Sequence, residues 1–385
     1  MVSRDLVHRF PFYYGWVILA AATLGFVMTG AGQTFAVSMF IEHLIRDLNL
    51  TRSEVSGLYT AATLLASLGL STAGRLIDRQ GCRRSVVWIS LALGASCVFL
   101  SFVQNGVMLL LGFTLIRFWG PGALGLVSNN VINQWWIGRR GRVMGFSGMV
   151  TAIFGFGLFP FLLHRLIGLS DWRTAFLVIG FGVWLVCLPV GGVFFRERPE
   201  NYGLRPDNSD MHQDEQAPLA EPDWSHREAI RTRTFWLVAA GLSTHAMMIT
   251  GLHFHIVGLF EAGGQKPGLA AQMYLPMGLV TATLCLVGGF LKERLPVRTL
   301  LTFSLALLGF TMLLGKNLDT FWVIAMYGLA LGTNSGLFQV IFGVVWADLF
   351  GRRQLGAITG TASSLIVAGS ALGPLPLAWA QAWLG

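Results

Sequence analysis

GRLIDR at residues 74–79 occurs a second time, with changes, as GFLKER at residues 289–294. In both copies a glycine is followed four residues later by a carboxylate, Asp78 or Glu293, and then by an arginine. The two copies are 215 residues apart, and a second pair of segments, GRR, recurs at nearly the same distance. Repetition at one long offset indicates a chain built from two similar units in parallel orientation.

Both copies lie between apolar runs that are long enough to cross a bilayer. A hydrocarbon core of about 30 Å takes roughly 20 helical residues, and a backbone in lipid must satisfy its own hydrogen bonds. The runs are too long for barrel strands, so an all-α membrane protein is expected. Eleven runs are predicted to be transmembrane helices: 13–41, 55–76, 86–103, 107–136, 143–167, 174–195, 235–260, 269–291, 300–314, 321–350 and 355–383.

The composition agrees with a polytopic membrane protein. Of 385 residues, 54% are hydrophobic and only 12% are charged, whereas soluble domains are about 25% charged. The four cysteines have no metal-site spacing and are interpreted as free thiols, and no motif of a membrane enzyme is present. The sequence therefore predicts no enzyme activity, no metal and no cofactor, and the net charge of +8 is assigned to loops rather than to a nucleic-acid partner.

The basic residues predict an orientation in the membrane. Twenty of the 27 Lys and Arg residues lie on the N-terminal segment and on every second connection, six lie on the other connections, and Arg117 lies inside a span. The positive-inside rule then places the N-terminus in the cytoplasm of a multi-pass protein, in the plasma membrane, which is the inner membrane of a bacterium.

One long polar segment divides the chain. Residues 197–231 contain four prolines among scattered acids, which is typical of a linker between bundles. The prediction is a six-helix bundle over 1–196, a cytoplasmic linker over 197–231, and a five-helix second bundle over 232–385. The repeat offset would put a twelfth span beyond the last residue, so a fragment is expected, with a natural eleven-span protein as the alternative.

The full motif GRLIDRQGCRR at residues 74–84 resembles the loop 2–3 signature of the major facilitator superfamily. RFWGPGA at residues 117–123 resembles that superfamily's span-four signature. Three further segments, YGW at 14–16, WIGRRGRVMG at 136–145 and RPENYGLRPD at 198–207, are similar to bacterial relatives of the monocarboxylate and oxalate/formate porters. The resemblance implies a two-bundle transporter that works by alternating access as a monomer.

The duplicated carboxylates suggest a gate on the cytoplasmic side. We expect Asp78 to lie against the N-terminus of the eleventh span near Gln354, and Glu293 to lie in the same way against the N-terminus of the fifth span near Arg142. The resemblance implies that such contacts form in the outward-open state, while the alternative is that these charges only set topology. The predicted gate residues are Gly74, Asp78, Arg79, Gly81, Arg83, Glu293 and Arg294.

Polar residues deep in the spans are candidates for the solute site. The resemblance implies that spans one, four, seven and ten line the central cavity, and these contain Gln33, Arg117, His245 and Asn334. A charge as deep as Arg117 is costly unless it faces water or a partner, and the alternative is a structural hydrogen-bond network. We expect Gln33, Arg117 and Asn334 to bind solute.

Histidine is the expected carrier if protons are coupled to transport. No Asp or Glu lies in the middle of a span, so His245 and His253 are the candidates, with hydrogen-bonded packing as the alternative. An unpaired cation in the membrane favours an anionic solute such as a monocarboxylate. The predicted function is secondary transport of a small organic anion, with efflux of hydrophobic compounds or a transport-inactive sensor as alternatives.

Overall fold

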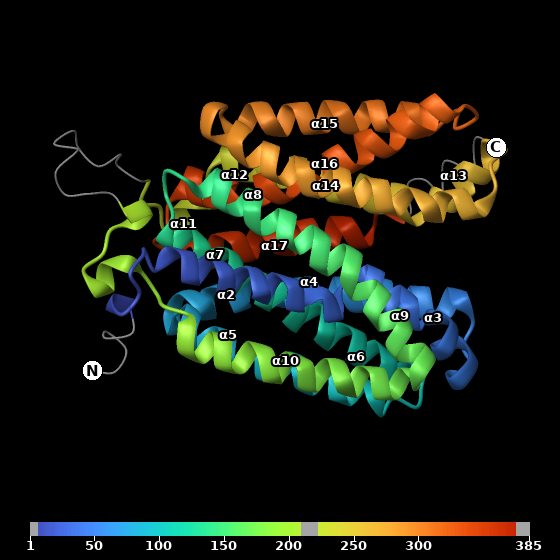
Figure 1. The fold of residues 1–385 in the computed structure, drawn as a ribbon, viewed down its shortest axis with the longest axis horizontal. Helices are drawn as coiled ribbons and strands as arrows, with labels where there is room; N and C mark the ends of the chain where they lie inside the picture. Colours follow the sequence, from blue (N-terminus) through green and yellow to red (C-terminus); the bar gives the residue numbers. More distant parts are fainter. Residues whose placement is uncertain (1–6, 209–221, 375–385) are drawn as a thin grey trace.

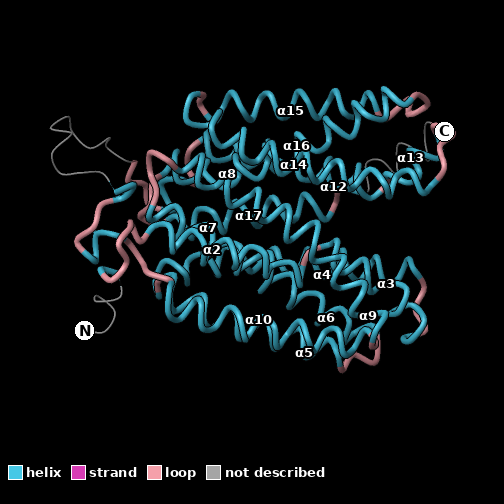
Figure 2. Tube along the Cα trace, in the orientation of Figure 1, coloured by secondary structure: helices cyan, strands magenta, loops and turns pink. Residues whose placement is uncertain are grey.

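The structure is a computed structural model that describes residues 7–208 and 222–374. Over those residues the chain is helical, without strands, and the helices run nearly parallel along one long axis (Figures 1 and 2). Ten helical segments are long and apolar enough to cross a membrane. The chain is therefore a multi-pass helical membrane protein, as predicted.

Several of the ten spans consist of more than one helical element. The elements before residue 196 are α2 (Gly15–Met28), η1 (Thr29–Gly32), α3 (Thr34–Leu48), α4 (Arg52–Gln80), α5 (Cys82–Ser101), α6 (Gly106–Arg117), η2 (Phe118–Leu124), α7 (Gly125–Trp135), α8 (Arg140–Thr151), η3 (Ala152–Leu158), α9 (Phe159–Leu169) and α10 (Trp172–Phe194). The later elements are η4 (Pro199–Tyr202), η5 (Pro206–Asn208), α11 (His226–Ala229), α12 (Arg233–Phe254), α13 (Ile256–Ala262), α14 (Pro267–Arg294), α15 (Val297–Leu314), α16 (Phe321–Phe350) and α17 (Leu355–Ala371).

Polar residues outside the apolar runs fix where helices begin. The hydroxyl of Thr51 accepts a hydrogen bond from the Glu54 amide, and the Glu54 carboxylate accepts one from the Thr51 amide, which forms a capping box at the start of α4. Asn105 and Asp171 cap α6 and α10 in the same way, each through its side-chain oxygen. Short polar connections thus separate the spans.

Buried apolar side chains form three clusters. The largest is drawn from residues 7–195, with Val344 as its one member from later in the chain, and the other two are drawn from residues 229–366 and 252–331. In Figure 1, α5, α6 and α10 lie along one side and α14, α15 and α16 along the other, with α4 and α17 adjacent between them. Contacts between α4 and α17 and between α8 and α14 connect the two sets of helices.

Ten of the eleven predicted runs coincide with these spans, and most helices extend a few residues beyond the apolar run. The run predicted over 235–260 is an exception, because α12 ends at Phe254 and the separate short helix α13 begins at Ile256. The run predicted over 355–383 begins as α17, and its residues after 374 lie outside the described part of the chain.

Regular α-helix is interrupted near the middle of three spans. The first span changes to a 3₁₀ turn at η1 and then to an extended residue, Gln33, before α3 begins. The fourth and fifth spans contain π-helical segments, η2 and η3, and η2 includes Pro121, which has no backbone N–H to donate. A side chain on Gly32 would collide with the Ile116 carbonyl and the Pro121 ring, so the interruptions in spans one and four lie in contact.

Candidate functional site

The end of the molecule where α4 ends and α17 begins also holds the described linker residues, and we call it the linker end (Figure 1). Two pairs of helices cross there at very short range. A Cβ atom on Gly74 of α4 would collide with the Gly356 carbonyl of α17, and one on Gly360 would come within 2.5 Å of the Leu70 carbonyl. Glycine is required at Gly74 because the two backbones touch.

The Asp78 carboxylate joins α4 to α17 directly. Its two oxygens accept hydrogen bonds from the backbone amides of Gly356 and Ala357, at 2.8 and 2.7 Å. These amides lie in the first turn of α17, where backbone N–H groups have no partner within the helix. Farther along the same crossing, the hydroxyls of Ser71 and Thr361 are 2.9 Å apart. The contact predicted for Asp78 is present, and its role in gating stays a prediction.

The crossing of α8 and α14 has similar backbone packing, but a different kind of side-chain contact joins its two helices. Cβ atoms on Gly141 and Gly289 would each lie 2.5 Å from the carbonyl oxygen of the other residue. Glu293 lies beside the first turn of α8, near Arg142 as predicted, but it forms an ion pair with the Arg142 guanidinium, whereas Asp78 accepts from backbone amides. The two crossings are therefore equivalent in backbone packing only.

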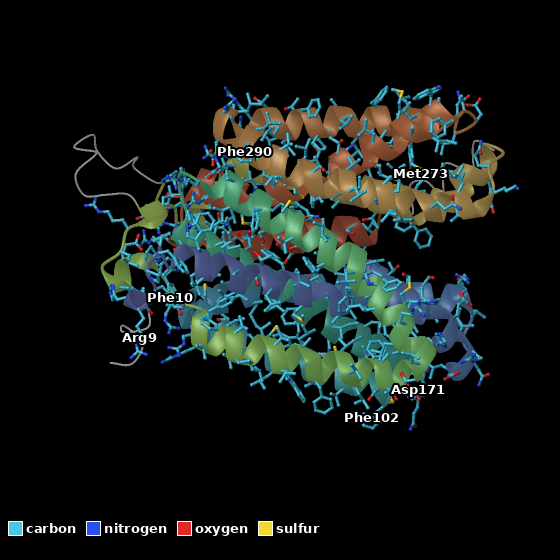
Figure 3. The ribbon with its side chains drawn as sticks, in the orientation of Figure 1. Arg9, Phe10, Phe102, Asp171, Met273 and Phe290 are labelled. Carbon is cyan, nitrogen blue, oxygen red and sulfur yellow. The ribbon has the colours of Figure 1, made fainter. Side chains whose placement is uncertain are left out.

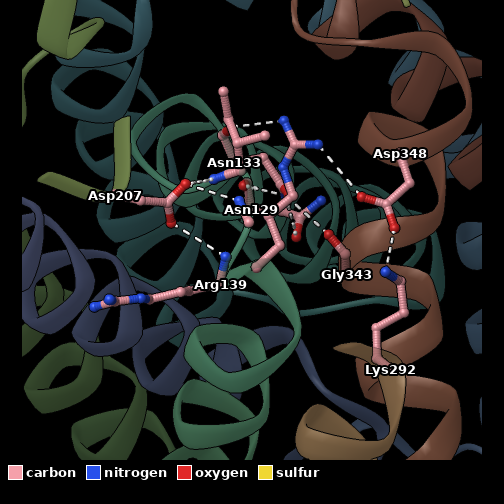
Figure 4. Close-up of polar contacts among 10 residues, drawn as sticks. Asn129, Asn133, Arg139, Asp207, Lys292, Gly343 and Asp348 are labelled. Atoms are coloured by element: carbon pink, nitrogen blue, oxygen red, sulfur yellow. Dashed lines mark hydrogen bonds and ion pairs between the residues drawn. The ribbon is translucent and has the colours of Figure 1, made fainter. Parts of the chain in front are cut away.

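A third set of contacts joins α7 to α16 between these crossings (Figure 4). The Asn133 amide donates to the Gly343 carbonyl at 2.8 Å and to the Asn129 carbonyl at 2.9 Å. Sequence reasoning did not assign the Asp348 carboxylate to the gate, but it pairs with Lys292 at 2.7 Å and with Arg140 at 3.3 Å. Its position just before the repeated GRR segment could have indicated that Asp348 belongs to the same group of contacts.

The linker contributes carboxylates of its own at this end. Asp207 accepts hydrogen bonds from three successive backbone amides, those of residues 137–139, at 2.7–3.1 Å (Figure 4). The Glu200 carboxylate accepts from Arg352 at 2.8 Å, and Arg352 also donates to the Gln134 carbonyl at 2.7 Å. Linker residues thus bind both GRR-containing connections, which the sequence had not suggested.

The remaining predicted gate residues have different surroundings. Gly81 has a positive φ of +85°, and a side chain there would collide with Glu197, whose carboxylate accepts from the Cys82 and Arg83 amides. The Arg83 guanidinium donates to the Gly192 carbonyl at 2.8 Å. Arg79 and Arg294 have exposed side chains without a hydrogen bond or ion pair to any described residue.

Arg117 lies where the interruptions of spans one and four meet. It is only 9% exposed, and one Nη atom donates to the Gly32 carbonyl at 3.2 Å. Its Cζ atom lies 5.5 Å from the centre of the Tyr59 ring, and its buried Nε has no hydrogen-bond partner. Over the described residues no carboxylate lies within ion-pair distance of Arg117. The nearby Gln33 side chain bonds to Thr29 at 3.5 Å.

His245 and Asn334 form a separate buried pair. The His245 Nε2 lies 3.4 Å from the Asn334 carbonyl oxygen, and both side chains have 0% exposure. Asn334 also bonds to Ser304 and Thr311 of α15, so all the hydrogen-bond partners of its side-chain amide lie in helices that follow the linker. His253 instead bonds to a backbone carbonyl of its own helix at 2.8 Å. The structure pairs Arg117 with the Gln33 segment and His245 with Asn334, without a hydrogen bond between the two pairs.

Comparisons with known proteins agree with this architecture. A family model described as Major Facilitator Superfamily matches residues 21–374. The probable L-galactonate transporter of Escherichia coli (strain K12) is 28% identical over 51% of this chain and 44% of its own length. The chain thus spans less than half the length of that relative. Monocarboxylate transporter 4 of Gallus gallus is 23% identical, over 88% of this chain and 71% of its own length.

Solved structures show the same fold at low identity. The human organic anion transporter MFSD10 (TETRAN) superposes with a TM-score of 0.73 at 15% identity, covering 95% of this chain and 93% of that one. The transporter FucP, in its outward conformation, superposes with a TM-score of 0.69 at 14% identity, covering 95% of this chain and 92% of that one. At such identities the likeness concerns the fold alone.

Proposed function

The chain belongs to the Major Facilitator Superfamily, whose members are transporters and not enzymes, and from this premise we propose that it carries a small organic anion across the membrane. A monocarboxylate is the proposed solute class. The named activities of two relatives, an L-galactonate transporter and a monocarboxylate transporter, support this class because both carry carboxylates.

The observation that carries the proposal is the unpaired cation Arg117. Its side chain is buried at membrane depth, and a charge there is costly unless a partner or water compensates it. A solute carboxylate supplies the missing negative charge and accepts from the free Nε–H, which Gly32 and Tyr59 leave unused. An apolar or cationic solute would leave Arg117 uncompensated.

We propose alternating access as the mechanism, with residues 1–196 and 232–385 as the two moving bundles. The crossings of α4 with α17 and of α8 with α14 close the linker end, and opening requires both to separate. The asymmetry of Lys and Arg supports a cytoplasmic linker end, so this state would be open to the opposite side. His245 and His253 are the proposed proton carriers.

Uptake of radiolabelled carboxylates into proteoliposomes tests the solute class. Wild type is expected to take up at least one monocarboxylate, faster with an inward proton gradient, and Arg117→Gln is expected to reduce uptake at least a hundredfold because a buried charge-assisted contact is lost. Arg165→Gln is the matched control, since it makes the same charge change at an exposed position. Arg117→Lys keeps the charge and should retain part of the uptake.

Two results would contradict the proposal. Carboxylate uptake by Arg117→Gln equal to that of Arg165→Gln would show that Arg117 does not bind the anion. Transport of hydrophobic compounds by wild type and Arg117→Gln alike, with no carboxylate flux, would establish efflux instead.

A further inference from the structure

The first span restarts as a new helix near its middle, and the start of that helix differs from the others. α3 begins at Thr34 inside the span Gly15–Leu48, after the extended residue Gln33. The helices α4, α6 and α10 each begin with a side chain that accepts from a backbone amide. Asp171, which does so for α10, lies at the end of the molecule opposite the linker end (Figure 3). The start of α3 is capped by no side chain of the described residues, and its first turn contains no acidic residue.

The backbone amide of Thr34 is a donor without an acceptor. The Gln33 carbonyl accepts from the amides of Ala36 and Val37, at 3.0 Å each, and these are the first backbone hydrogen bonds of α3. Among the residues that the structure describes, the Thr34 N–H has no hydrogen-bond partner. The N-terminus of a helix carries a partial positive charge, equivalent to about half an elementary charge, and it favours an anion.

Arg117 lies beside this helix start. One of its Nη atoms donates to the carbonyl of Gly32, which is two residues before Thr34 in the chain. Its Cζ atom lies 5.5 Å from the centre of the Tyr59 ring, and the Tyr59 hydroxyl lies 2.9 Å from the Thr34 hydroxyl. The guanidinium group and the start of α3 therefore border the same small region, and Tyr59 of α4 contacts both.

Two sources of positive charge meet in this region. Arg117 contacts a carbonyl oxygen and an aromatic ring, and neither of these carries a net negative charge. Thr34 is exposed, and Gln33 and Tyr59 are half-buried, so a solute can reach the helix start. Because the effective dielectric constant is lower at membrane depth than in water, an anion bound there is attracted by both groups more strongly than it would be at a surface.

We propose that one carboxylate group of the solute binds between Arg117 and the start of α3, with one oxygen accepting from the guanidinium and the other from the Thr34 amide. This inference rests on the proposed function, because it names a second group that binds the solute anion. A carboxylate suits the place because each of its two oxygens can accept from one of the two donors. The segment around Gln33 thus binds solute through a backbone amide.

Thr34→Pro tests this assignment, because proline lacks the backbone N–H. Proline is favoured at the first position of a helix, and the residue before a proline is normally extended, as Gln33 already is with φ of −78° and ψ of 151°. The measurement is the binding of radiolabelled L-lactate and L-galactonate to the purified chain in detergent. Thr34→Pro should weaken binding about tenfold, because one charge-assisted hydrogen bond is lost.

Two further variants are the controls for this loss. Thr34→Val removes the hydroxyl but keeps the amide, so it should weaken binding severalfold less than Thr34→Pro does. Gly106→Pro places a proline at the first position of α6, where a Cβ atom makes only ordinary van der Waals contacts. Binding by Gly106→Pro should equal that of wild type.

A change at Gln33 gives a result that misfolding does not produce. Gln33→Asp places a carboxylate at the start of α3, where it competes with the solute for Arg117 and for the helix N-terminus. Gln33→Asn is the matched variant, because it caps the helix without a charge. Gln33→Asp should bind the two probes at least tenfold more weakly than Gln33→Asn and should unfold at a higher temperature.

Equal binding by Thr34→Pro and Thr34→Val would overturn the inference, and so would a thermal midpoint of Gln33→Asp no higher than that of Gln33→Asn. If Arg117→Gln still abolishes uptake when either result is found, the proposed function stands and only the role of α3 is wrong. If wild type binds neither L-lactate nor L-galactonate, this inference and the proposed solute class are overturned together.

Discussion

Single carboxylates and one histidine set the chemistry of the closed linker end. Among the linker residues, His226 makes two contacts with the start of α17. Its backbone amide donates to the Gln354 side-chain oxygen at 2.7 Å, and its Nε2 lies 2.8 Å from the Thr361 hydroxyl. Thr361 in turn contacts Ser71 of α4. The His226 side chain therefore connects the linker with α17 directly and, through Thr361, with α4.

His226 predicts a dependence of stability on pH. Burial, and then the charge of Arg75, lower the pKa of His226 below its usual value of about 6.5. The unfolded chain then binds a proton at a higher pH than the folded chain does. The free energy of unfolding should therefore fall as the pH is lowered through about 6.5, and thermal unfolding in detergent over that range measures it.

His226→Gln should flatten this fall, because the titrating group is gone. His164→Gln is the matched control, since His164 is exposed in α9. If the two variants lose stability equally on acidification, His226 is not the titrating group.

At the scale of helices, the sequence was most informative about spans and least informative about their interruptions. Length and hydrophobicity determine whether a segment crosses a membrane, so ten predicted spans are present. The extended residue Gln33 follows Gly32, which contacts Ile116 of the fourth span, 84 residues later in the sequence, and no local pattern indicates this contact. A pairing such as that of His245 with Asn334 likewise arises only from tertiary packing.

Some contacts of the candidate site were predictable from the sequence and others were not. The contact of Asp78 with the start of α17 was predicted because the repeat showed a carboxylate at one fixed position beside a helix end. The nearness of Glu293 to Arg142 was predicted as well, but the kind of contact was not, since the choice between a backbone amide and the Arg142 side chain depends on the angle at which the helices meet. Asp207 was missed because its hydrogen-bond donors are backbone amides, which every residue except proline has, so no residue type in the sequence points to them.

The close contact between α4 and α17 predicts that a single methyl group added at Gly74 strongly weakens this crossing. Gly74→Ala places a Cβ atom against the Gly356 carbonyl, so α4 and α17 must separate and the closed linker end is destabilised. The native Cys285 reports such opening, because it is buried in the α8–α14 crossing. Its rate of alkylation by N-ethylmaleimide, mapped by mass spectrometry, should rise at least severalfold.

Gly182→Ala is the control for this experiment. Gly182 lies inside α10, and a Cβ atom there meets open space. Equal alkylation of Cys285 in both variants would show that close contact at Gly74 does not hold the linker end closed.

At the scale of the whole molecule, the linker adds contacts to those that the helix crossings and the α7–α16 contacts already make between the two sets of helices. Its residues bind the connection before α8 through Asp207 and the connection before α17 through Glu200. The linker is thus a structural component of the closed end, in addition to being a covalent tether between the proposed bundles.

Asp207→Asn tests the contribution of the linker to stability. The amide keeps the size of the side chain but loses the charge that three backbone amides share, which should lower the free energy of unfolding by about 1–3 kcal/mol. The thermal midpoint in detergent should fall accordingly. Asp319→Asn is the control, because Asp319 is exposed at the other end, and an equal midpoint for both variants would show that the Asp207 contacts contribute nothing.

The two crossings are held by different kinds of contact, so ionic strength should affect their stability to different degrees. The Asp78 carboxylate is paired with backbone amides at a partly buried position in the α4–α17 crossing, where dissolved ions screen a contact less than at the surface. Arg142, the partner of Glu293, is 53% exposed, and dissolved salt weakens such a pair. A rise in salt concentration on the linker side should therefore weaken the contact between α8 and α14 more than that between α4 and α17, and we expect the solvent composition on that side to influence which crossing separates first.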